Sequence, residues 1–270
     1  MIGKIATAKR VLKTEGVTGA IWAFKERYLD RWFGDEINWC YGRLLELKGN
    51  VIEIDGCTFS LNSPAITTRS KSKFFNGQYE KPEREAVNRF IDPSLPVIEL
   101  GGSIGVVSCV TNRRLSRPEL HVVVEANPKL VPLLIANRER NNCKFVVLSR
   151  MLGYNGETGT FYANNDNFVI GSAVATDTSA LEIEVSTVNL RSIIKEYEFD
   201  RCTLICDIEG GESDLLRYEA DVLGDKVQTI MLEVHEWSLG KDRVSEIFQE
   251  LNTLGFTEVF KQQDTYVFQK

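Results

Sequence analysis

Short apolar runs that end at a glycine or an acidic residue recur along the chain, and helical patterns lie between them. The run Val97–Leu100 ends in two glycines, and the run His121–Glu125 ends in an acid followed by Ala-Asn-Pro. Runs of this length bounded by turn residues are typical of buried strands that lead into helices. The pattern predicts an α/β fold with a central sheet.

Other segments complete this outline. Alternating apolar and polar residues around Gly56 predict a hairpin over 51–61, and the segment 74–85 leads into a helix that ends near Asp92. The remaining predicted elements are strands over 144–149, 203–207 and 229–234, an inserted β section over 158–163, 168–175 and 181–188, helices over 129–137, 190–198 and 243–254, and a terminal hairpin over 258–261 and 265–269.

The N-terminal region differs from the rest, which predicts an amphipathic helical segment over 1–48 ahead of one domain over 49–270, with its motifs in 96–270. Residues 1–34 hold seven Lys or Arg against three Asp or Glu. The apolar residues of one helical stripe are Val17, Ala20, Ile21, Phe24, Tyr28 and Trp32. A basic amphipathic helix suits peripheral contact with an anionic membrane, or a partner protein. We favour packing on the domain over 49–270 or across a homodimer, because such stripes are usually buried.

The loop after the first strand carries the strongest motif. Gly101, Gly102 and Gly105 lie there, but Ser103 stands where a G-x-G-x-x-G dinucleotide loop has its middle glycine. Adjacent glycines let a ligand approach the backbone, and the amides of the following helix face it. The loop therefore predicts a ligand site, with an ordinary glycine-rich turn as the alternative.

The charges around this loop indicate which ligand it binds. Glu99 lies at the strand tip, and residues 97–112 contain no Lys or Arg. An acid opposes a pyrophosphate but suits a cationic ligand such as S-adenosylmethionine, which has a sulfonium, an ammonium and no phosphate. Glu125 ends the second strand, where a carboxylate accepts both ribose hydroxyls of an adenosyl group, and Ala126 and Asn127 follow it.

Five motifs occur in an order that resembles the FkbM family of S-adenosylmethionine-dependent methyltransferases: ELGGSIG, VVVEANP, VLSRMLGYNGETGTFY, DIEGGE over 207–212 and LEVH over 232–235. The resemblance covers residues 51–270. It implies a Rossmann-like class I methyltransferase fold, with a seven-stranded, mostly parallel sheet, helices on both faces and an antiparallel final strand. It also implies methylation of a hydroxyl oxygen on a sugar, a glycan or another small molecule. The family more often has an acid and Gly-Ala in the first motif and Gly-Ala-Glu in the fourth, but neither departure removes a functional group.

The resemblance also implies roles for individual residues. Tyr79 and Glu80 belong to a segment that covers the cofactor in the family, although a solvated helix start is an equal alternative. Met151 and Leu152 follow the third strand and would form an apolar slot for the adenine, unless they are core residues. The loop at 171–172 resembles a family loop near the substrate.

The candidate catalytic residues lie at or just past strand ends, where ligands bind in open α/β sheets. If the first, fourth and fifth parallel strands are neighbours, as in the family fold, Asp207 and His235 lie about 5 Å apart. Methyl transfer to a hydroxyl needs a base. His235 has an ordinary pKa near neutrality and is the first candidate, with a structural role as an equal alternative. His121 begins its strand, at the opposite edge of the sheet, and is predicted to be structural.

Two carboxylates are the other catalytic candidates. Asp207 is expected to orient the acceptor, or to act as the base if burial raises its pKa; capping of the next helix is its alternative. Glu209 is the third candidate, unless it is only an acid in the first turn of that helix. Both carboxylates suit Mg²⁺, but no residue cluster in the sequence requires a metal.

Composition narrows the class of protein. A net charge of −6 disfavours nucleic acid as a partner. The six cysteines show no zinc-like spacing, so we expect reduced thiols, with Cys202 and Cys206 on one strand face. The absence of a membrane-spanning run and of a signal-peptide core predicts a cytoplasmic protein.

Two other functions compete with the methyltransferase hypothesis. They are a catalytically inactive cofactor-binding module and an NAD-dependent oxidoreductase. Nothing in the sequence specifies the methyl acceptor.

Overall fold

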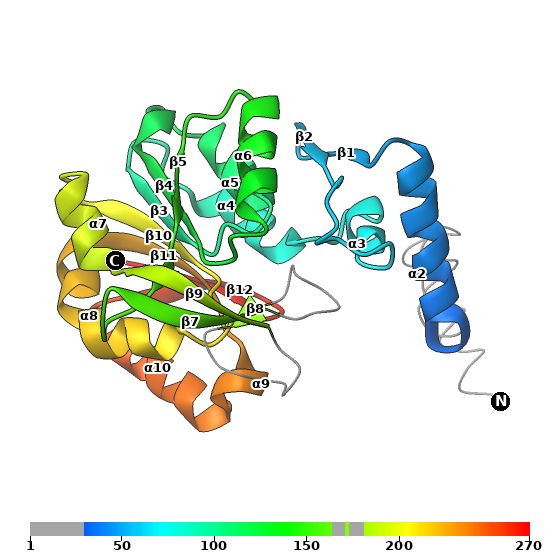
Figure 1. Ribbon diagram of the computed structural model, residues 1–270. Coiled ribbons are helices and arrows are strands. Elements are labelled where there is room, and N and C mark those ends of the chain that lie inside the picture. Colours follow the sequence, from blue (N-terminus) through cyan, green and yellow to red (C-terminus); the bar gives the residue numbers. More distant parts are fainter. Residues whose placement is uncertain (1–29, 164–170, 173–180) are drawn as a thin grey trace, which may run out of the picture.

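Seven strands form a mostly parallel sheet in the computed structural model, which describes residues 30–163, 171–172 and 181–270 (Figure 1). The strands are, in spatial order, β12 (Thr257–Gln262), β13 (Thr265–Gln269), β11 (Val227–Glu233), β10 (Cys202–Cys206), β3 (Val97–Leu100), β4 (His121–Glu125) and β5 (Val146–Ser149). Strands β11, β10, β3, β4 and β5 run parallel, and β13 pairs antiparallel with β11 and β12. This order confirms the predicted sheet, its antiparallel final strand and the expected adjacency of β3, β10 and β11.

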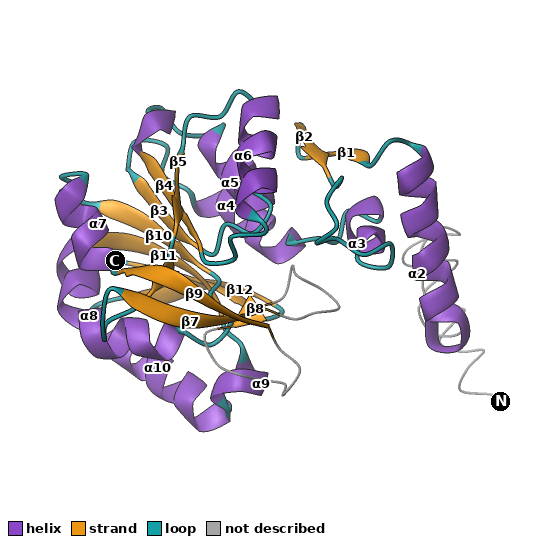
Figure 2. Cartoon of the chain, in the orientation of Figure 1, coloured by secondary structure: helices purple, strands orange, loops and turns teal. Residues whose placement is uncertain are grey.

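Helices cover both faces of the sheet, as Figure 2 shows in purple around the orange strands. One face is covered by α4 (Lys81–Phe90), α5 (Val106–Asn112) and α6 (Val131–Arg140). The other face is covered by α7 (Leu190–Glu196), α8 (Glu212–Lys226) and α10 (Lys241–Thr253). The short helices are α3 (Lys71–Phe75), η2 (Pro118–Leu120) and α9 (Glu236–Leu239). The α/β fold with two covered faces is therefore confirmed.

Each central strand contributes to two hydrophobic cores. In β3, Val97 packs into the core beneath α4, α5 and α6, whereas Ile98 and Leu100 pack into the core beneath α7, α8 and α10. The reason is that successive side chains of a strand point to opposite faces. Both faces are covered, so these strands are apolar at nearly every position, as parallel strands usually are. Cys202 and Cys206 are free thiols buried in the second core, as predicted.

A long helix, α2 (Asp30–Leu47), precedes the sheet and lies beside α3 at the edge of the molecule (Figure 1). Glu46 of α2 accepts a hydrogen bond from the ammonium of Lys71 at 2.9 Å, which ties the two helices together. The predicted apolar stripe between residues 17 and 32 lies outside the part of the chain whose side chains are described. Its membrane, partner and homodimer interpretations therefore stay predictions. None of the described helices is both long enough and apolar enough to cross a membrane.

The predicted N-terminal hairpin is present, formed by β1 (Val51–Ile54) and β2 (Cys57–Ser60). The side chain of Asn137, on α6, accepts a hydrogen bond from the backbone N–H of Ser60 at 2.8 Å. Asn141, one turn later, accepts one from the N–H of Thr58 at 2.7 Å. These two amides replace the strand partner that the edge of this hairpin lacks and attach it to the sheet domain.

The inserted β section forms a separate sheet in the order β6 (Met151–Leu152), β9 (Leu181–Val188), β7 (Thr158–Ala163) and β8 (Gly171–Ser172). The strands predicted over 158–163 and 181–188 are confirmed to the residue. Of the strand predicted over 168–175, the structure describes residues 171–172. The prediction for the helix over 129–137 was wrong at its start, because α6 begins at Val131 and has Pro132 in its first turn.

Gly101 lets the ends of β3 and β10 lie side by side. Its φ is +95°, and a Cβ at this position would lie 1.8 Å from the carbonyl oxygen of Asp207. The backbone N–H of Asp207 donates to the carbonyl of Leu100 at 2.9 Å, and the N–H of Gly101 donates to Val124 at 2.9 Å. A side chain at position 101 would therefore push apart three strand ends that hydrogen bonds hold together.

Replacing Gly101 by alanine should lower the free energy of unfolding by about 2–5 kcal/mol. A left-handed backbone costs about 1–2 kcal/mol for a residue with a Cβ, and overpacking adds about 1–3 kcal/mol. Gly255→Ala is the matched control, since Gly255 has a φ of +90° and a Cβ there would have nothing within 4 Å. Urea unfolding followed by circular dichroism measures both losses. Equal losses would mean that the contact with Asp207 is not what requires Gly101.

Candidate functional site

A cavity of about 660 Å³ opens at the carboxyl ends of β3, β4, β10 and β11. Ten of the fourteen site residues predicted from the sequence line it: Tyr79, Gly101, Ser103, Glu125, Ala126, Asn127, Met151, Leu152, Asp207 and Glu209. Of the other four, His235 contacts residues that line the cavity, whereas Glu99, Gly102 and Gly105 do not form part of its described lining. Most of the predicted site is thus brought together at one edge of the sheet, where open α/β sheets bind ligands.

Glu99 does not reach the cavity, so the prediction that it meets a cationic ligand is wrong. Strand alternation turns its side chain toward α5, where it is 1% exposed. The carboxylate accepts hydrogen bonds from the hydroxyl of Ser108 at 2.6 Å and from the imidazole of His121 at 3.1 Å. Glu99 is therefore a structural carboxylate. His121 has a structural role, as predicted, because it is the hydrogen-bond partner of Glu99.

Gly102 and Gly105 serve packing, and their role in cofactor binding stays a prediction. A Cβ at Gly102 would lie 2.4 Å from Val123, and a Cβ at Gly105 would lie 2.6 Å from Leu134. These glycines let the loop lie close to β4 and α6. The space that a Cβ would need at these two glycines is filled by the side chains of Val123 and Leu134.

Glu125 is the carboxylate that fits the predicted cofactor site best. Its two oxygens accept the backbone N–H groups of Ser103 and Asn127, both at 2.6 Å. Burial raises the pKa of this carboxyl to about 7, although the two hydrogen bonds oppose the shift. Each oxygen keeps a second lone pair, so the carboxylate can still accept two hydroxyl donors from the cavity.

The segment before α4 forms another wall of the cavity through Tyr79. Its hydroxyl lies 2.9 Å from the hydroxyl of Ser103, and its ring stacks on Phe74 with centroids 3.8 Å apart. The buried guanidinium of Arg84 donates to the carbonyl oxygen of Tyr79 at 3.0 Å and to the carboxylate of Asp55 at 2.7 Å. Arg84 thereby connects this wall to the N-terminal hairpin.

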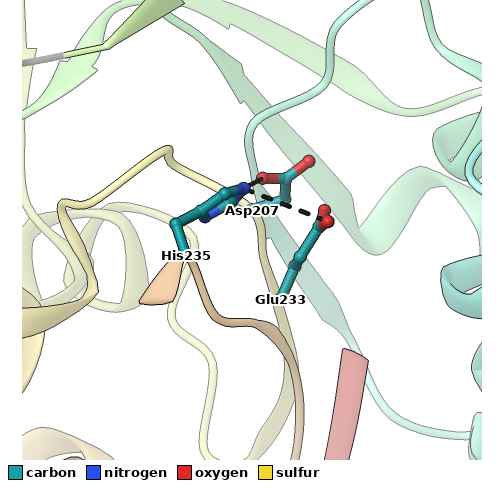
Figure 3. Close-up of side chains that lie close together, drawn as sticks. All are labelled: Asp207, Glu233 and His235. Carbon is teal, nitrogen blue, oxygen red and sulfur yellow. Dashed lines mark ion pairs between the residues drawn. The ribbon is translucent and has the colours of Figure 1, made fainter. Parts of the chain in front are cut away.

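Carboxylates surround one imidazole where β10 and β11 end, and we call Asp207, Glu209, Glu233 and His235 the strand-end cluster. Nδ1 of His235 donates to Glu212 at 3.2 Å. Nε2 lies 3.3 Å from Glu209, 3.6 Å from Asp207 and 4.0 Å from Glu233. Figure 3 shows the ring with Nε2 directed at the carboxylates of Asp207 and Glu233. The adjacency of Asp207 and His235 agrees with the spacing expected from the strand order.

The charges of the cluster shift its pKa values. Burial lowers the pKa of the His235 imidazole, but its hydrogen bond to Glu212 and the charge of Glu209 outweigh burial and raise the pKa to about 9. His235 was the first candidate for the base because an ordinary, near-neutral pKa was expected for it. That expectation was wrong, because the surrounding carboxylates raise the pKa. Burial raises the pKa of Asp207 well above its usual range, and the charge of Glu233 adds to that shift.

Backbone strain concentrates at this cavity. Glu80, Ser103 and Glu209 have φ angles of 47°, 46° and 52°, and all three line it. A residue with a Cβ costs about 1–3 kcal/mol in such a conformation, so neighbouring contacts must hold it. For Ser103 the contacts are the bonds to Glu125 and Tyr79. Strain of this kind collects at functional sites.

Two residues of the site were missed from the sequence. Glu233 is the last residue of β11, so the strand-end rule that selected Asp207 would have selected it as well. Glu212 lies in the first turn of α8 and is fully buried against His235. Further lining residues to which the sequence analysis gave no role include Lys73, Arg150 and Phe161.

Comparison with protein families identifies a methyltransferase domain. The model described as "Methyltransferase FkbM domain" matches residues 99–258. No curated protein matches the chain. The matched range holds the glycine loop, Glu125 and the strand-end cluster.

Solved structures that resemble this chain include several methyltransferases. They include a putative RNA methyltransferase from Pyrococcus horikoshii (15% identity, 72% of this chain and 84% of that chain covered, TM-score 0.42). They also include a precorrin-6y C5,15-methyltransferase from Geobacter metallireducens (10% identity, 72% of this chain and 89% of that chain covered, TM-score 0.43). A third is TYW2 of M. jannaschii in complex with AdoMet (13% identity, 81% of this chain and 82% of that chain covered, TM-score 0.41). At these low scores the likenesses carry no argument, and the fold class rests on the strand order of the sheet.

Glu99→Gln should lower the free energy of unfolding by about 1–3 kcal/mol, because an amide cannot accept hydrogen bonds from both Ser108 and His121 at a buried site. Its affinity for the expected cofactor, S-adenosylmethionine, should stay within twofold of the unmodified chain. The exposed Glu119→Gln is the control for the loss of one charge. A tenfold loss of affinity with unchanged urea unfolding would return Glu99 to the ligand site.

Proposed function

The chain belongs to the FkbM methyltransferase family, and on that premise we propose that it transfers the methyl group of S-adenosylmethionine to a hydroxyl of a sugar, a glycan or another small molecule. The observation that carries this proposal is the pairing of two sites in one cavity. Glu125, on β4, is suited to the ribose of the cofactor, and the strand-end cluster lies two to three strands away on β10 and β11. Strands are about 4.8 Å apart, so the two sites are about 10–14 Å apart along the sheet edge.

On the cofactor side, hydrogen bonding and apolar surface support the assignment. The carboxylate of Glu125 is held by two backbone amides and accepts the two ribose hydroxyls. Met151 and Leu152 supply the apolar slot for the adenine. Tyr79 covers the cofactor from the segment before α4. A ribose at the end of β4 leaves the sulfonium to lie toward β3 and β10, next to the strand-end cluster.

On the acceptor side, Asp207 holds the acceptor hydroxyl and Glu209 takes its proton. The hydroxyl oxygen attacks the methyl carbon in line with the carbon–sulfur bond, and that bond breaks with its electron pair retained by sulfur. The products are the methyl ether and neutral S-adenosylhomocysteine, and the hydroxyl proton ends on the carboxylate of Glu209. Both carboxylates line the cavity, which supports their contact with the acceptor. Most of the rate enhancement then comes from holding the oxygen behind the methyl group.

His235 has a different task in this proposal from the one expected from the sequence. Its side chain is 7% exposed and lies behind the described lining of the cavity. The acceptor therefore meets Asp207 and Glu209 before it meets the imidazole. We assign His235 to positioning the carboxylates of the cluster.

The size and charge of the site support a small acceptor. A cavity of about 660 Å³ must hold the cofactor and the acceptor together, and pockets of 300–1,000 Å³ usually hold one drug-sized ligand. A monosaccharide, or the end of a glycan chain, fits the remaining room. The net charge of −6 supports an acceptor other than nucleic acid.

Glu125→Gln tests the cofactor assignment. Losing the charged acceptor should weaken S-adenosylhomocysteine binding by about 1.5–3 kcal/mol, or roughly 10- to 150-fold, in calorimetry at pH 8. The pKa of about 7 adds a pH dependence. Hydroxyl donors bind the ionised form, so affinity in the unmodified chain should rise from pH 6 to pH 8, whereas the variant should show little change from this group. Unchanged affinity would refute the ribose assignment, and tighter binding of NAD would favour the oxidoreductase hypothesis.

Glu209→Gln tests the proton acceptor. Turnover should fall by about 10²- to 10⁴-fold, the usual contribution of a general base, while affinity for S-adenosylhomocysteine stays within about twofold. Transfer of a labelled methyl group to a panel of sugars and short glycans, assayed with the best acceptor, measures the rate. Glu236→Gln, at an exposed carboxylate outside the described lining, is the control and should keep normal turnover. Normal turnover in Glu209→Gln would place the base elsewhere.

A further inference from the structure

Three potential metal ligands converge where β10 and β11 end. Asp207 follows β10, Glu233 ends β11, and His235 lies two residues further on. One oxygen from each carboxylate and one imidazole nitrogen all lie within 4.8 Å of one another. Figure 3 shows the three side chains directed at a common point from the two neighbouring strands. A mixed set of carboxylate oxygens and an imidazole nitrogen is typical of divalent-cation sites in proteins.

The two distances from His235 to the carboxylates fit a single ion. Ligand atoms bound at about 2.0–2.2 Å to one ion lie at most about 4.4 Å apart. Nε2 of His235 lies 3.6 Å from Oδ1 of Asp207 and 4.0 Å from Oε1 of Glu233. Both separations fall inside that limit, and both are too long for a direct hydrogen bond.

The hydrogen bond on the far side of the ring supports a metal independently of this clustering. Nδ1 of His235 donates to Glu212, whose side chain is fully buried. Histidines that bind metals almost always donate their other ring N–H to a carboxylate, a carbonyl or water, which fixes the tautomer. In a metal-bound form the ring would be neutral, and this bond would direct its Nε2 lone pair toward Asp207 and Glu233.

One buried oxygen of the cluster lacks a hydrogen-bond donor of its own. Oδ1 of Asp207 is inaccessible to solvent and has no hydrogen bond to any described residue. The His235 side chain is more than nine-tenths buried, and carboxylates surround its Nε2, the nearest being that of Glu209 at 3.3 Å. Unpartnered buried polar atoms are costly. A cation between Oδ1 and Nε2 would give Oδ1 the partner that it lacks.

We propose that Asp207, Glu233 and His235 bind a divalent cation of the Mg²⁺ and Mn²⁺ class, with Glu212 as the positioning partner of the histidine. Two carboxylates favour a hard cation, and one imidazole is a ligand that Mn²⁺ also accepts. Three protein ligands leave coordination positions open toward the cavity. This inference rests on the proposed function for its role: a cation held by these residues would act as a Lewis acid toward the acceptor hydroxyl.

Mn²⁺ is the probe for the test, with the full chain treated with a chelator and dialysed. Calorimetry and the electron paramagnetic resonance signal of free Mn²⁺ should report one site. Glu233→Gln and His235→Gln should each weaken Mn²⁺ binding at least tenfold, and Glu212→Gln should weaken it about 10- to 100-fold. Glu236→Gln, at an exposed neighbouring carboxylate, is the matched control and should bind as the unmodified chain does. Absence of Mn²⁺ binding at millimolar concentration, or unchanged binding in His235→Gln, would overturn the proposal.

Two further measurements keep the test decisive. If a variant fails to fold, pulsed electron paramagnetic resonance of Mn²⁺ in the unmodified chain should still show nitrogen coupling from one imidazole. The chain has two histidines, and His121 is buried against Glu99, so the coupling would identify His235. Absence of nitrogen coupling would overturn the site.

Titration with S-adenosylhomocysteine in the absence of metal separates failure of the cation site from failure of the proposed function. Normal cofactor binding without Mn²⁺ binding would refute the cation site alone, whereas loss of cofactor binding would refute the proposed function.

Discussion

The close approach of β3 and β10 at their carboxyl ends is the constraint on which the site depends. Gly101 has no Cβ, and the carbonyl of Asp207 occupies the space that a Cβ would take. Backbone hydrogen bonds from Asp207 to Leu100 and from Gly101 to Val124 then hold the ends of β10, β3 and β4 together. With these strand ends adjacent, side chains that are more than eighty residues apart in sequence face the same cavity.

The two sides of that cavity are built by opposite physical means. On the side of β4, backbone amides hold a single carboxylate, Glu125, and the left-handed conformation of Ser103 directs one of those amides at it. The local geometry is therefore determined by the main chain. On the side of β10 and β11, side chains of like charge lie together around one imidazole. Such an arrangement is expensive unless a proton or a cation compensates it.

The N-terminal hairpin and the segment before α4 contribute to the site although they lie outside the central sheet. Arg84 is buried and connects the carbonyl of Tyr79 with the carboxylate of Asp55 in the hairpin turn. Asn137 and Asn141 attach the same hairpin to α6. The cavity wall formed by Tyr79 is thus held by Arg84 to the hairpin, and the hairpin is held by α6. The position of Tyr79 therefore depends on contacts between segments that lie far apart in the sequence.

The amino-acid sequence by itself determined the fold class, the edge of the sheet that carries the site and most of the residues there. Parallel strands covered on both faces must be apolar, and their ends are marked by glycine and by acids, so Gly101, Glu125 and Asp207 could be located from local pattern alone. The tertiary structure decided what local pattern does not encode. Strand alternation turned Glu99 into the core against His121, and Gly102 and Gly105 let the loop pack closely against Val123 and Leu134. The pKa of His235 depends on carboxylates from β10, β11 and the start of α8, which come together only when these elements pack. Electrostatic environment is a property of distances in space, and the sequence spacing of these residues does not contain it.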